Sequence, residues 1–376
     1  MTEREVRIAF NMIPAVGAVT FERLLREAQG DAVAAWEMYP EKLDWQGKEP
    51  DWQREIEQAV KMNVRIITEV DDDYPPLLKT IASPPLALYA VGDTKVLSQP
   101  AVALVGTRHC TEYGRDTAEK LAFSLAKRGW CVVSGLASGI DAAAHTGALS
   151  ADGKTIGVLG SALDKFYPQD TRPLARRMVA NGGCVVSEFS FGRSPDAQTF
   201  PQRNRIVSGL CQGVVAVEAS LHSGTLITCS IANEQGRTVM AVPGRVDWRT
   251  SDGCNNLIRE GVCLVTSADD IIESLTPLSD FSNSVVKQRG GRGGRGHAGT
   301  RAPTKAAGAA RTPPLPEVMI SAEEASILRL LNAEGVTLDA IVAGCGLPIS
   351  KVNTLTVGLR LKGKVRLLSG NRVASI

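Results

Sequence analysis

The chain has 376 residues, of which 44% are hydrophobic and 22% charged, with a formal net charge of +2. This length and composition support packed cores in roughly two or three domains and exclude a chain that is unfolded throughout. Its eight cysteines contain no C-x-x-C pair, and no long apolar stretch follows the charged amino terminus. The sequence therefore predicts a soluble, cytoplasmic protein with no metal, no cofactor and no membrane span.

Residues 1–65 are predicted to form a small helical domain, because apolar side chains recur there at helical spacing. The segment Ile13–Gly17 resembles the turn of a helix-hairpin-helix, so the domain is described as SAM-like or helix-hairpin-helix-like. The glycine of such a turn lets backbone N–H groups approach a phosphate. An ordinary turn of a helical bundle has the same pattern, and both interpretations stay open.

Residues 66–276 alternate short apolar strands with helices. This pattern predicts an extended, doubly wound, Rossmann-like α/β domain whose mostly parallel sheet is covered on both faces. Ligands bind such sheets at the carboxyl ends of the strands. The predicted strands are Ala101–Val105, Cys131–Val133, Thr155–Leu159, Cys184–Ser187, Gly213–Val217, Thr238–Val242 and Val262–Val265. The predicted helices between them include Thr117–Lys127, Ile140–Leu149, Pro173–Ala180 and Thr225–Glu234.

The last quarter of the chain carries an excess of basic charge. Residues 277–316 lose all periodicity and contain an arginine-glycine run, which predicts a disordered linker; such repeats could also track nucleic acid loosely. Residues 317–376 read as three helices followed by a hairpin, the pattern of a winged helix. Its basic residues could contact duplex DNA, although winged helices also dock proteins. They are Lys351, Arg360, Lys362, Lys364 and Arg366.

The stretch Phe200–Leu210 places two arginines and an amide beside an aromatic ring. A guanidinium suits phosphate oxygens and also stacks on flat rings, and a single-stranded nucleic acid needs both contacts. The alternative is one structural arginine that pairs with a carboxylate and one solvated arginine.

Other loops at the expected strand ends could also hold an anion. Val105–Arg108 lacks the glycine pattern of a dinucleotide site but puts a cation at a helix start. Ser134–Asp141 could cradle a phosphate, and we expect Asp141 to hydrogen-bond His145 one turn later. Ser223–Thr228 offers N–H groups and hydroxyls, or simply a helix cap. No serine has the neighbouring histidine and aspartate that would activate it.

Taken together, these motifs resemble the DprA/Smf family of bacterial DNA-processing proteins. They occur in that family's order and include Tyr167-Pro168, Val217–Ala219, Val242–Gly244 and Gly253–Ile258. The resemblance implies a non-catalytic domain that binds single-stranded DNA, a homodimer, and delivery of incoming DNA to the RecA recombinase during natural transformation. It also implies that Arg108, Arg203 and Arg205 hold phosphates, while Phe200, Gln202 and Asn204 contact bases or shape the pocket.

The residues that the resemblance assigns to single-stranded DNA are Gly106, Thr107, Arg108, Ser134, Gly135, Gly139, Lys165, Phe200, Gln202, Arg203, Asn204, Arg205, Ser223, Gly224 and Thr225. The candidates for self-association are Leu257, Ile258, Val262 and Leu264, although a core strand would look the same. The third helix of the winged helix departs from the family's more acidic pattern, since it reads Leu359-Arg360-Leu361-Lys362. That departure favours DNA contact there.

Two other functions stay open. A nucleotide phosphoribohydrolase of the LOG type would need a glutamate where this chain has Thr228, although Glu188 or Glu218 could substitute. A ligand-sensing transcription factor with a winged-helix reader would bind specific duplex sequences instead of single strands.

Overall fold

A computed structural model describes residues 1–13, 16–42, 49–275, 322–332, 335–347, 352, 355–356, 359, 364–368 and 372–375. The chain divides into two compact units, Met1–Arg292 and Gly293–Ile376. The linker predicted at 277–316 lies outside the described residues.

A nine-stranded sheet in the order β1-β2-β6-β5-β4-β3-β7-β8-β9 forms the centre of the first unit. The pairs β1/β2 and β2/β6 are antiparallel and the remaining pairs are parallel, which confirms the predicted mostly parallel α/β fold. The sequence-based prediction missed β1 and β2. The strands are β1 Arg65–Thr68, β2 Ala87–Gly92, β3 Ala101–Gly106, β4 Cys131–Ser134, β5 Thr155–Val158, β6 Cys184–Ser187, β7 Gly213–Glu218, β8 Thr238–Ala241 and β9 Cys263–Leu264.

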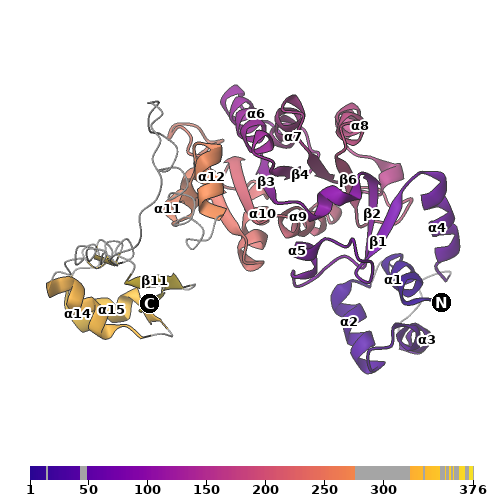
Figure 1. Ribbon diagram of the computed structural model, residues 1–376, viewed down its shortest axis with the longest axis horizontal. Coiled ribbons are helices and arrows are strands. Elements are labelled where there is room, and N and C mark those ends of the chain that lie inside the picture. Colours follow the sequence, from indigo (N-terminus) through magenta and orange to yellow (C-terminus); the bar gives the residue numbers. More distant parts are fainter. Residues whose placement is uncertain are drawn as a thin grey trace, which may run out of the picture. The chain divides into compact units, whose positions relative to one another are not determined.

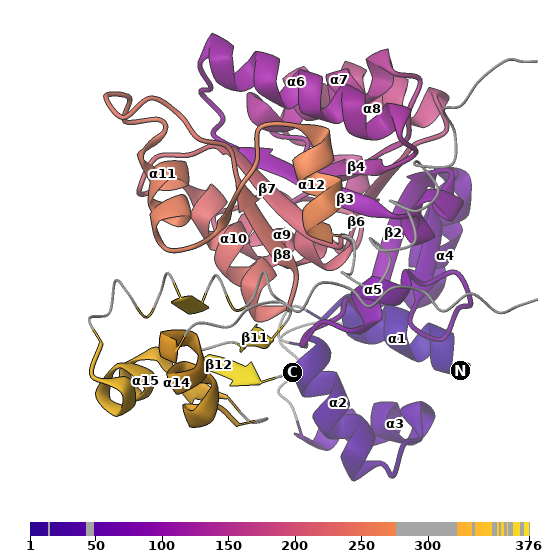
Figure 2. The same ribbon diagram turned by 60° about the vertical axis from the view of Figure 1, so that its left-hand side comes forward.

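Helices cover both faces of this sheet (Figures 1 and 2). Alternate residues of β3 enter different cores: Val102 and Leu104 pack with α6 and α7, whereas Ala103 and Val105 pack with α9 and α10. The helices are α5 Pro76–Lys79, α6 Glu112–Lys127, α7 Ile140–Ser150, α8 Arg172–Ala180, α9 Thr199–Gly209, α10 Gly224–Glu234, α11 Asp252–Arg259 and α12 Ala268–Leu275. Short 3₁₀ turns are η1 Thr94–Ser98, η2 Leu163–Lys165 and η3 Gln169–Thr171.

The amino-terminal part is helical, as predicted, with α1 Glu3–Asn11, α2 Ala18–Glu27, α3 Ala32–Lys42 and α4 Trp52–Lys61. A capping box of Thr2 and Glu5 starts α1. The ring of Phe10 lies at the centre of this bundle and meets other aromatic rings edge-on at 5.0–5.2 Å. Two residues of the predicted hairpin turn, Pro14 and Ala15, lie outside the described residues.

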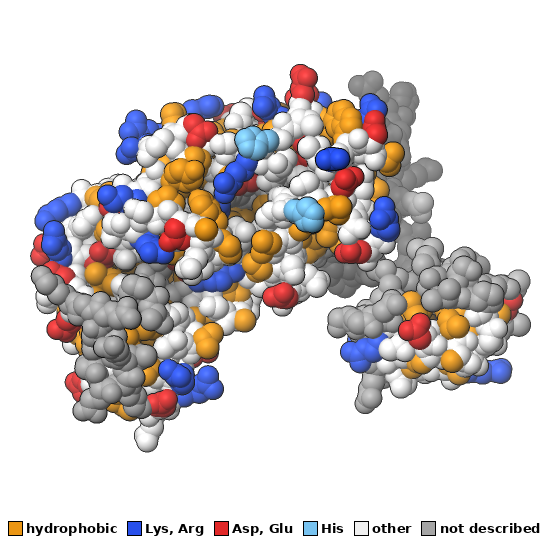
Figure 3. All heavy atoms as spheres, turned by 180° about the vertical axis from the view of Figure 1, so that it is seen from behind, with side chains coloured by type: hydrophobic (Ala, Val, Ile, Leu, Met, Phe, Trp, Pro, Cys, Tyr) orange, Lys and Arg blue, Asp and Glu red, His pale blue; other side chains and the backbone are white. Residues whose placement is uncertain are grey.

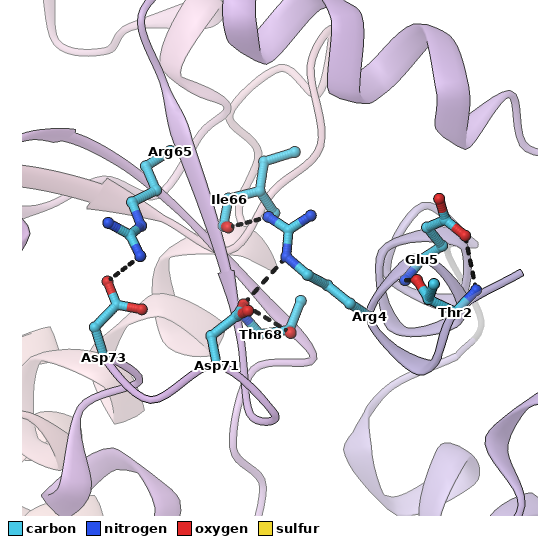
Figure 4. Close-up of polar contacts among 8 residues, drawn as sticks. All are labelled: Thr2, Arg4, Glu5, Arg65, Ile66, Thr68, Asp71 and Asp73. Atoms are coloured by element: carbon cyan, nitrogen blue, oxygen red, sulfur yellow. Dashed lines mark hydrogen bonds and ion pairs between the residues drawn. The ribbon is translucent and has the colours of Figure 1, made fainter.

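The first helix is fastened to the edge strand β1 (Figure 4). Arg4 Nη2 donates to the carbonyl of Ile66 at 2.6 Å, and Arg4 Nε lies 3.3 Å from Asp71. Asp71 in turn accepts from the backbone N–H of Thr68 at 2.7 Å. These bonds satisfy polar groups on the outer edge of the sheet, where an unpaired strand would otherwise be exposed.

The second unit agrees with the predicted winged helix. A three-stranded antiparallel sheet packs with two helices around buried Ile327, Ile341 and Val373. Its elements are α14 Ala322–Leu330, β10 Val336–Thr337, α15 Leu338–Cys345, β11 Val365–Leu368 and β12 Arg372–Ser375. Of the basic candidates, Lys364 and Arg366 are exposed, whereas Lys351, Arg360 and Lys362 lie outside the described residues. Among the helices described in either unit, none has the length and apolar character needed to cross a bilayer.

Candidate functional site

A cavity of about 450 Å³ opens at the carboxyl ends of β3, β4 and β7, beside the start of α9. We call it the Phe200 pocket. It lies where a doubly wound sheet is expected to bind its ligand. The predicted DNA-contact residues that line it are Gly106, Thr107, Arg108, Gly135, Phe200, Arg203, Asn204, Ser223, Gly224 and Thr225.

A cation and an aromatic ring stack at this pocket. The exposed guanidinium of Arg108 lies 4.9 Å from the centroid of the Phe200 ring. The ring of Tyr167 lies 6.1 Å from Phe200 at an angle of 57°. Phe200 also packs on Gly160, where a Cβ atom would stand only 2.9 Å from the Phe200 ring. Gly160 therefore makes room for a ring that can stack on a base, next to a cation that can bind a phosphate.

Arg203 lines the same pocket but is only 5% exposed. Its Nη1 donates to the carbonyl of Val158 at 2.6 Å. Burial lowers the pKa of Arg203 to about 10, against the opposing influence of Asp141. Arg203 is thus held by the protein itself, and its predicted role in holding a phosphate stays a prediction. Of the two arginines, Arg205 is the one that pairs with a carboxylate, as the structural alternative expects. Gly135 is required beneath Arg203, since an added Cβ would meet Nη1 at 1.8 Å.

The predicted hydrogen bond between Asp141 and His145 is wrong. Asp141 Oδ2 instead accepts from the N–H groups of Gly135 and Ala137, at 3.1 and 3.3 Å. His145 Nδ1 lies 2.7 Å from Thr155 Oγ1, whose own proton is donated to the carbonyl of Val132. Nδ1 must therefore be the donor, because that hydroxyl has a single proton.

Lowering the pH should destabilise the fold through His145. Burial lowers the pKa of this imidazole from 6.5 to about 3, with a smaller contribution from nearby Arg203. At pH values between 6.5 and about 3, His145 is protonated in the unfolded chain but neutral in the folded protein. Stability should then fall as the pH drops through that range, by up to about 1.4 kcal/mol per pH unit. Urea unfolding across this range would measure the slope.

The control for this prediction compares two histidines. His145→Gln should flatten the slope, whereas His222→Gln, at an exposed position, should leave it as it is. Equal slopes for the wild type and His145→Gln would contradict the assignment.

Arg205 and Gln202 face a different cavity. Arg205 lies two residues after Arg203 on α9, and side chains two residues apart on a helix point about 200° away from each other. Arg205 accordingly forms an ion pair with Glu188 and, together with Gln202, lines a second cavity of about 510 Å³, which we call the Arg205 cavity. Burial raises the pKa of Glu188, and Arg205 opposes that shift. The three predicted phosphate-binding arginines are therefore not brought together in one site.

The other predicted contacts have different settings. Ser134 is buried and donates to the carbonyl of Leu104, and Lys165 is exposed on η2 without lining the Phe200 pocket. Gly139 has φ +77° and caps α7, where a Cβ would stand 2.4 Å from the carbonyl oxygen of Thr107. Ser223 caps α10 by accepting from the N–H of Thr225 at 3.2 Å, so the capping alternative holds.

Sequence reasoning missed several pocket residues, chiefly His109, Ser220 and Ile227. Ile227 is 48% exposed although it lies one turn after Gly224 on α10. Because Ile227 follows Gly224 by three residues, the sequence alone could have placed both residues on the same side of the helix, facing the pocket. On the face drawn in Figure 3, basic, histidine and hydrophobic side chains lie close together over the first unit.

The candidate catalytic carboxylates lie elsewhere. Glu188 lines the Arg205 cavity, and the buried Glu218 accepts from the N–H of Thr111 at 2.9 Å. Among the described residues that line the Phe200 pocket, the carboxylate is Asp141, which is held by backbone N–H groups. The pocket thus lacks the substitutes that a phosphoribohydrolase would need.

Of the self-association candidates, Leu257, Ile258 and Val262 are partly buried against the core. Leu264 is 47% exposed on β9, the last strand of the sheet.

The family described as DNA recombination-mediator protein A matches residues 65–276, and the DprA winged helix domain matches residues 306–371. Protein Smf of Synechocystis sp. is 34% identical over 392 residues, which cover 99% of this chain and 98% of that protein. DNA processing protein DprA of Streptococcus pneumoniae is 45% identical over 203 residues, covering 54% of this chain and 71% of that protein. The X-ray structure of DprA from Streptococcus pneumoniae has a TM-score of 0.61 and 34% identity, and covers 73% of this chain and 98% of that one.

Proposed function

Because the chain belongs to the DprA/Smf family of DNA recombination-mediator proteins, we propose that its Phe200 pocket binds single-stranded DNA without catalysing a reaction on it. The observation that carries this proposal is the exposed Arg108 guanidinium against the Phe200 ring. A single strand presents phosphates and unstacked bases side by side, and these two groups meet both needs.

In this proposal each group has a defined part. Arg108 binds a backbone phosphate, and a base stacks on Phe200 with Ile227 as a further apolar contact. Arg203 and Asp141 hold the floor of the pocket by binding backbone groups of neighbouring strand ends. Contacts of this kind read phosphates and ring faces, so they predict little base preference.

We further propose that the protein acts in the cytoplasm as a homodimer that protects incoming DNA and loads RecA onto it during natural transformation. The exposed Leu264 on the edge strand β9 supports self-association there, and light scattering would test it. RecA-driven strand exchange, with and without the full chain, would test loading. Exposed Lys364 and Arg366 favour an additional duplex contact by the winged helix.

The single-strand proposal predicts that Arg108→Ala weakens binding of a labelled oligonucleotide by about 1.4 kcal/mol, roughly tenfold. Losing one phosphate contact should also flatten the slope of log K against log salt by about 0.7. Fluorescence anisotropy across a salt series, with single-stranded and duplex probes, measures both effects.

Arg128→Ala is the matched control, because Arg128 forms a surface ion pair with Asp269 beyond the end of α6. It should change neither affinity nor slope. Equal or tighter duplex binding that ignores Arg108 would contradict the proposal and favour the transcription-factor alternative.

A further inference from the structure

We propose that the Arg205 cavity is a second contact for the same DNA strand, on the side of α9 opposite to the Phe200 pocket. This inference rests on the proposed function of the Phe200 pocket. It assigns a ligand to a cavity between the amino-terminal helices and the sheet domain, and so gives those helices a part in binding.

The charge of the cavity suits a polyanion. The cavity is lined by two cations, Arg193 and Arg205. Among the described residues that line it, the one carboxylate belongs to Glu188, whose charge is compensated by the ion pair with Arg205. Arg193 pairs at 2.6 Å with Asp196, but both side chains are more than 40% exposed (45% and 42%). Such an exposed pair is weak, so a phosphate can compete for the guanidinium.

Neutral groups in the cavity complete the chemistry of a single-strand site. The exposed amides of Gln198 and Gln202 can bond phosphates or base edges, and Phe189 contributes a partly exposed ring. Basic groups combined with an aromatic surface are what a strand without fixed sequence requires. The volume of about 510 Å³ lies in the range of sites that enclose a small ligand such as a nucleotide.

The amino-terminal helices form the other wall. Asn11 Nδ2 donates to the carbonyl of Glu188 at 2.9 Å, which ties the end of α1 to this cavity. Gly17, at the start of α2, also lines it and has open space where a side chain would stand. The helix begins there without a side-chain cap, so its backbone can face a ligand directly.

Because the two cavities lie on opposite sides of the same helix, a single DNA strand can occupy both. Phe200 and Asn204 face the first cavity, and Gln202 and Arg205 face the second, all from α9. A helix is about 10–12 Å across. A strand that contacts both cavities must therefore continue around this helix, beyond the nucleotides that occupy the Phe200 pocket.

The test uses the full chain and two oligothymidylates. One has about 4 nucleotides and fills the Phe200 pocket alone; the other has about 12 and can reach both cavities. Gln202→Glu adds a negative charge at an exposed position of the Arg205 cavity. At about 0.15 M salt, exposed charges are screened beyond about 8 Å. We expect this variant to bind the longer oligonucleotide about tenfold more weakly under that condition and to bind the shorter one as the wild type does. Arg193→Ala should act in the same direction.

The matched controls place the same chemical changes elsewhere. Gln99→Glu alters an exposed glutamine just before β3, at the opposite end of the strands, and Arg128→Ala removes another exposed ion pair. Neither substitution should weaken binding of one oligonucleotide more than binding of the other. An effect of Gln202→Glu on both lengths, or on neither, would overturn the second contact. If the folded wild type binds neither length, the proposed function of the Phe200 pocket fails instead.

Discussion

We expect Arg203→Ala to lower the free energy of unfolding by about 3 kcal/mol at neutral pH. The side chain is 5% exposed, and its loss removes a charged hydrogen bond to the carbonyl of Val158. The carbonyl then remains unsatisfied, and a cavity opens beside Gly135. Asp141 also loses the nearby positive charge that opposes the burial-induced rise of its pKa.

Urea unfolding of the wild type and the variant at neutral pH would measure this difference. Arg128→Ala, which breaks an exposed pair, should change the same free energy by only about 0–1 kcal/mol. Arg203→Met separates the cavity from the polar contributions, because it keeps most of the volume but loses the hydrogen bond and the positive charge. If Arg203→Ala is as stable as the wild type but binds DNA poorly, this arginine contacts the strand and the structural assignment is wrong.

Phe200→Ala should weaken binding of single-stranded DNA by about 2 kcal/mol, roughly 30-fold, because one base loses its stacking surface. The salt slope should stay unchanged, since no phosphate contact is removed directly. This combination distinguishes the ring from Arg108, whose loss flattens the slope. Anisotropy titrations at several salt concentrations report both quantities on the same samples.

Phe123→Ala provides a closely matched control. Phe123 is a partly exposed ring on α6 with the ammonium of Lys127 at 5.6 Å from its centroid, so it resembles the Phe200–Arg108 pair in kind. It lies on the other face of the sheet. If both substitutions weaken binding equally, the effect comes from a general loss of structure instead of from stacking.

The parallel part of the sheet was predictable because buried strands read as continuous apolar runs between helices. The edge strands β1 and β2 were not recognised. Pro75, Pro76, Pro84 and Pro85 lie close to them and suggested an irregular entry segment, and the antiparallel pairing of β2 with β6 joins residues nearly a hundred positions apart. Such pairing leaves no local pattern.

The sequence did not predict that Arg203 and Arg205 line different cavities, because it left the secondary structure of this stretch open. The apolar residues that end the stretch Phe200–Leu210 fit either a strand or a helix. In an extended segment Arg203 and Arg205 would project from one face, whereas on α9 they project nearly opposite ways. The Asp141 and His145 pairing failed for a related reason. Their spacing is correct for contact along a helix, but the N–H groups of the preceding loop are closer to the carboxylate.

The two edge strands of the sheet, β1 and β9, differ in how readily they could pair with a second copy of the chain. At β1, Arg4 occupies the carbonyl of Ile66, whereas β9 ends the described sheet with the apolar Leu264 exposed. If two copies pair through β9, the assembly has a capped strand at each outer margin. Such a pair is closed by a two-fold axis and cannot add a third copy by the same contact. The bond made by Arg4 would then limit the size of the assembly, which protects a protein with an extended sheet from growing into fibres.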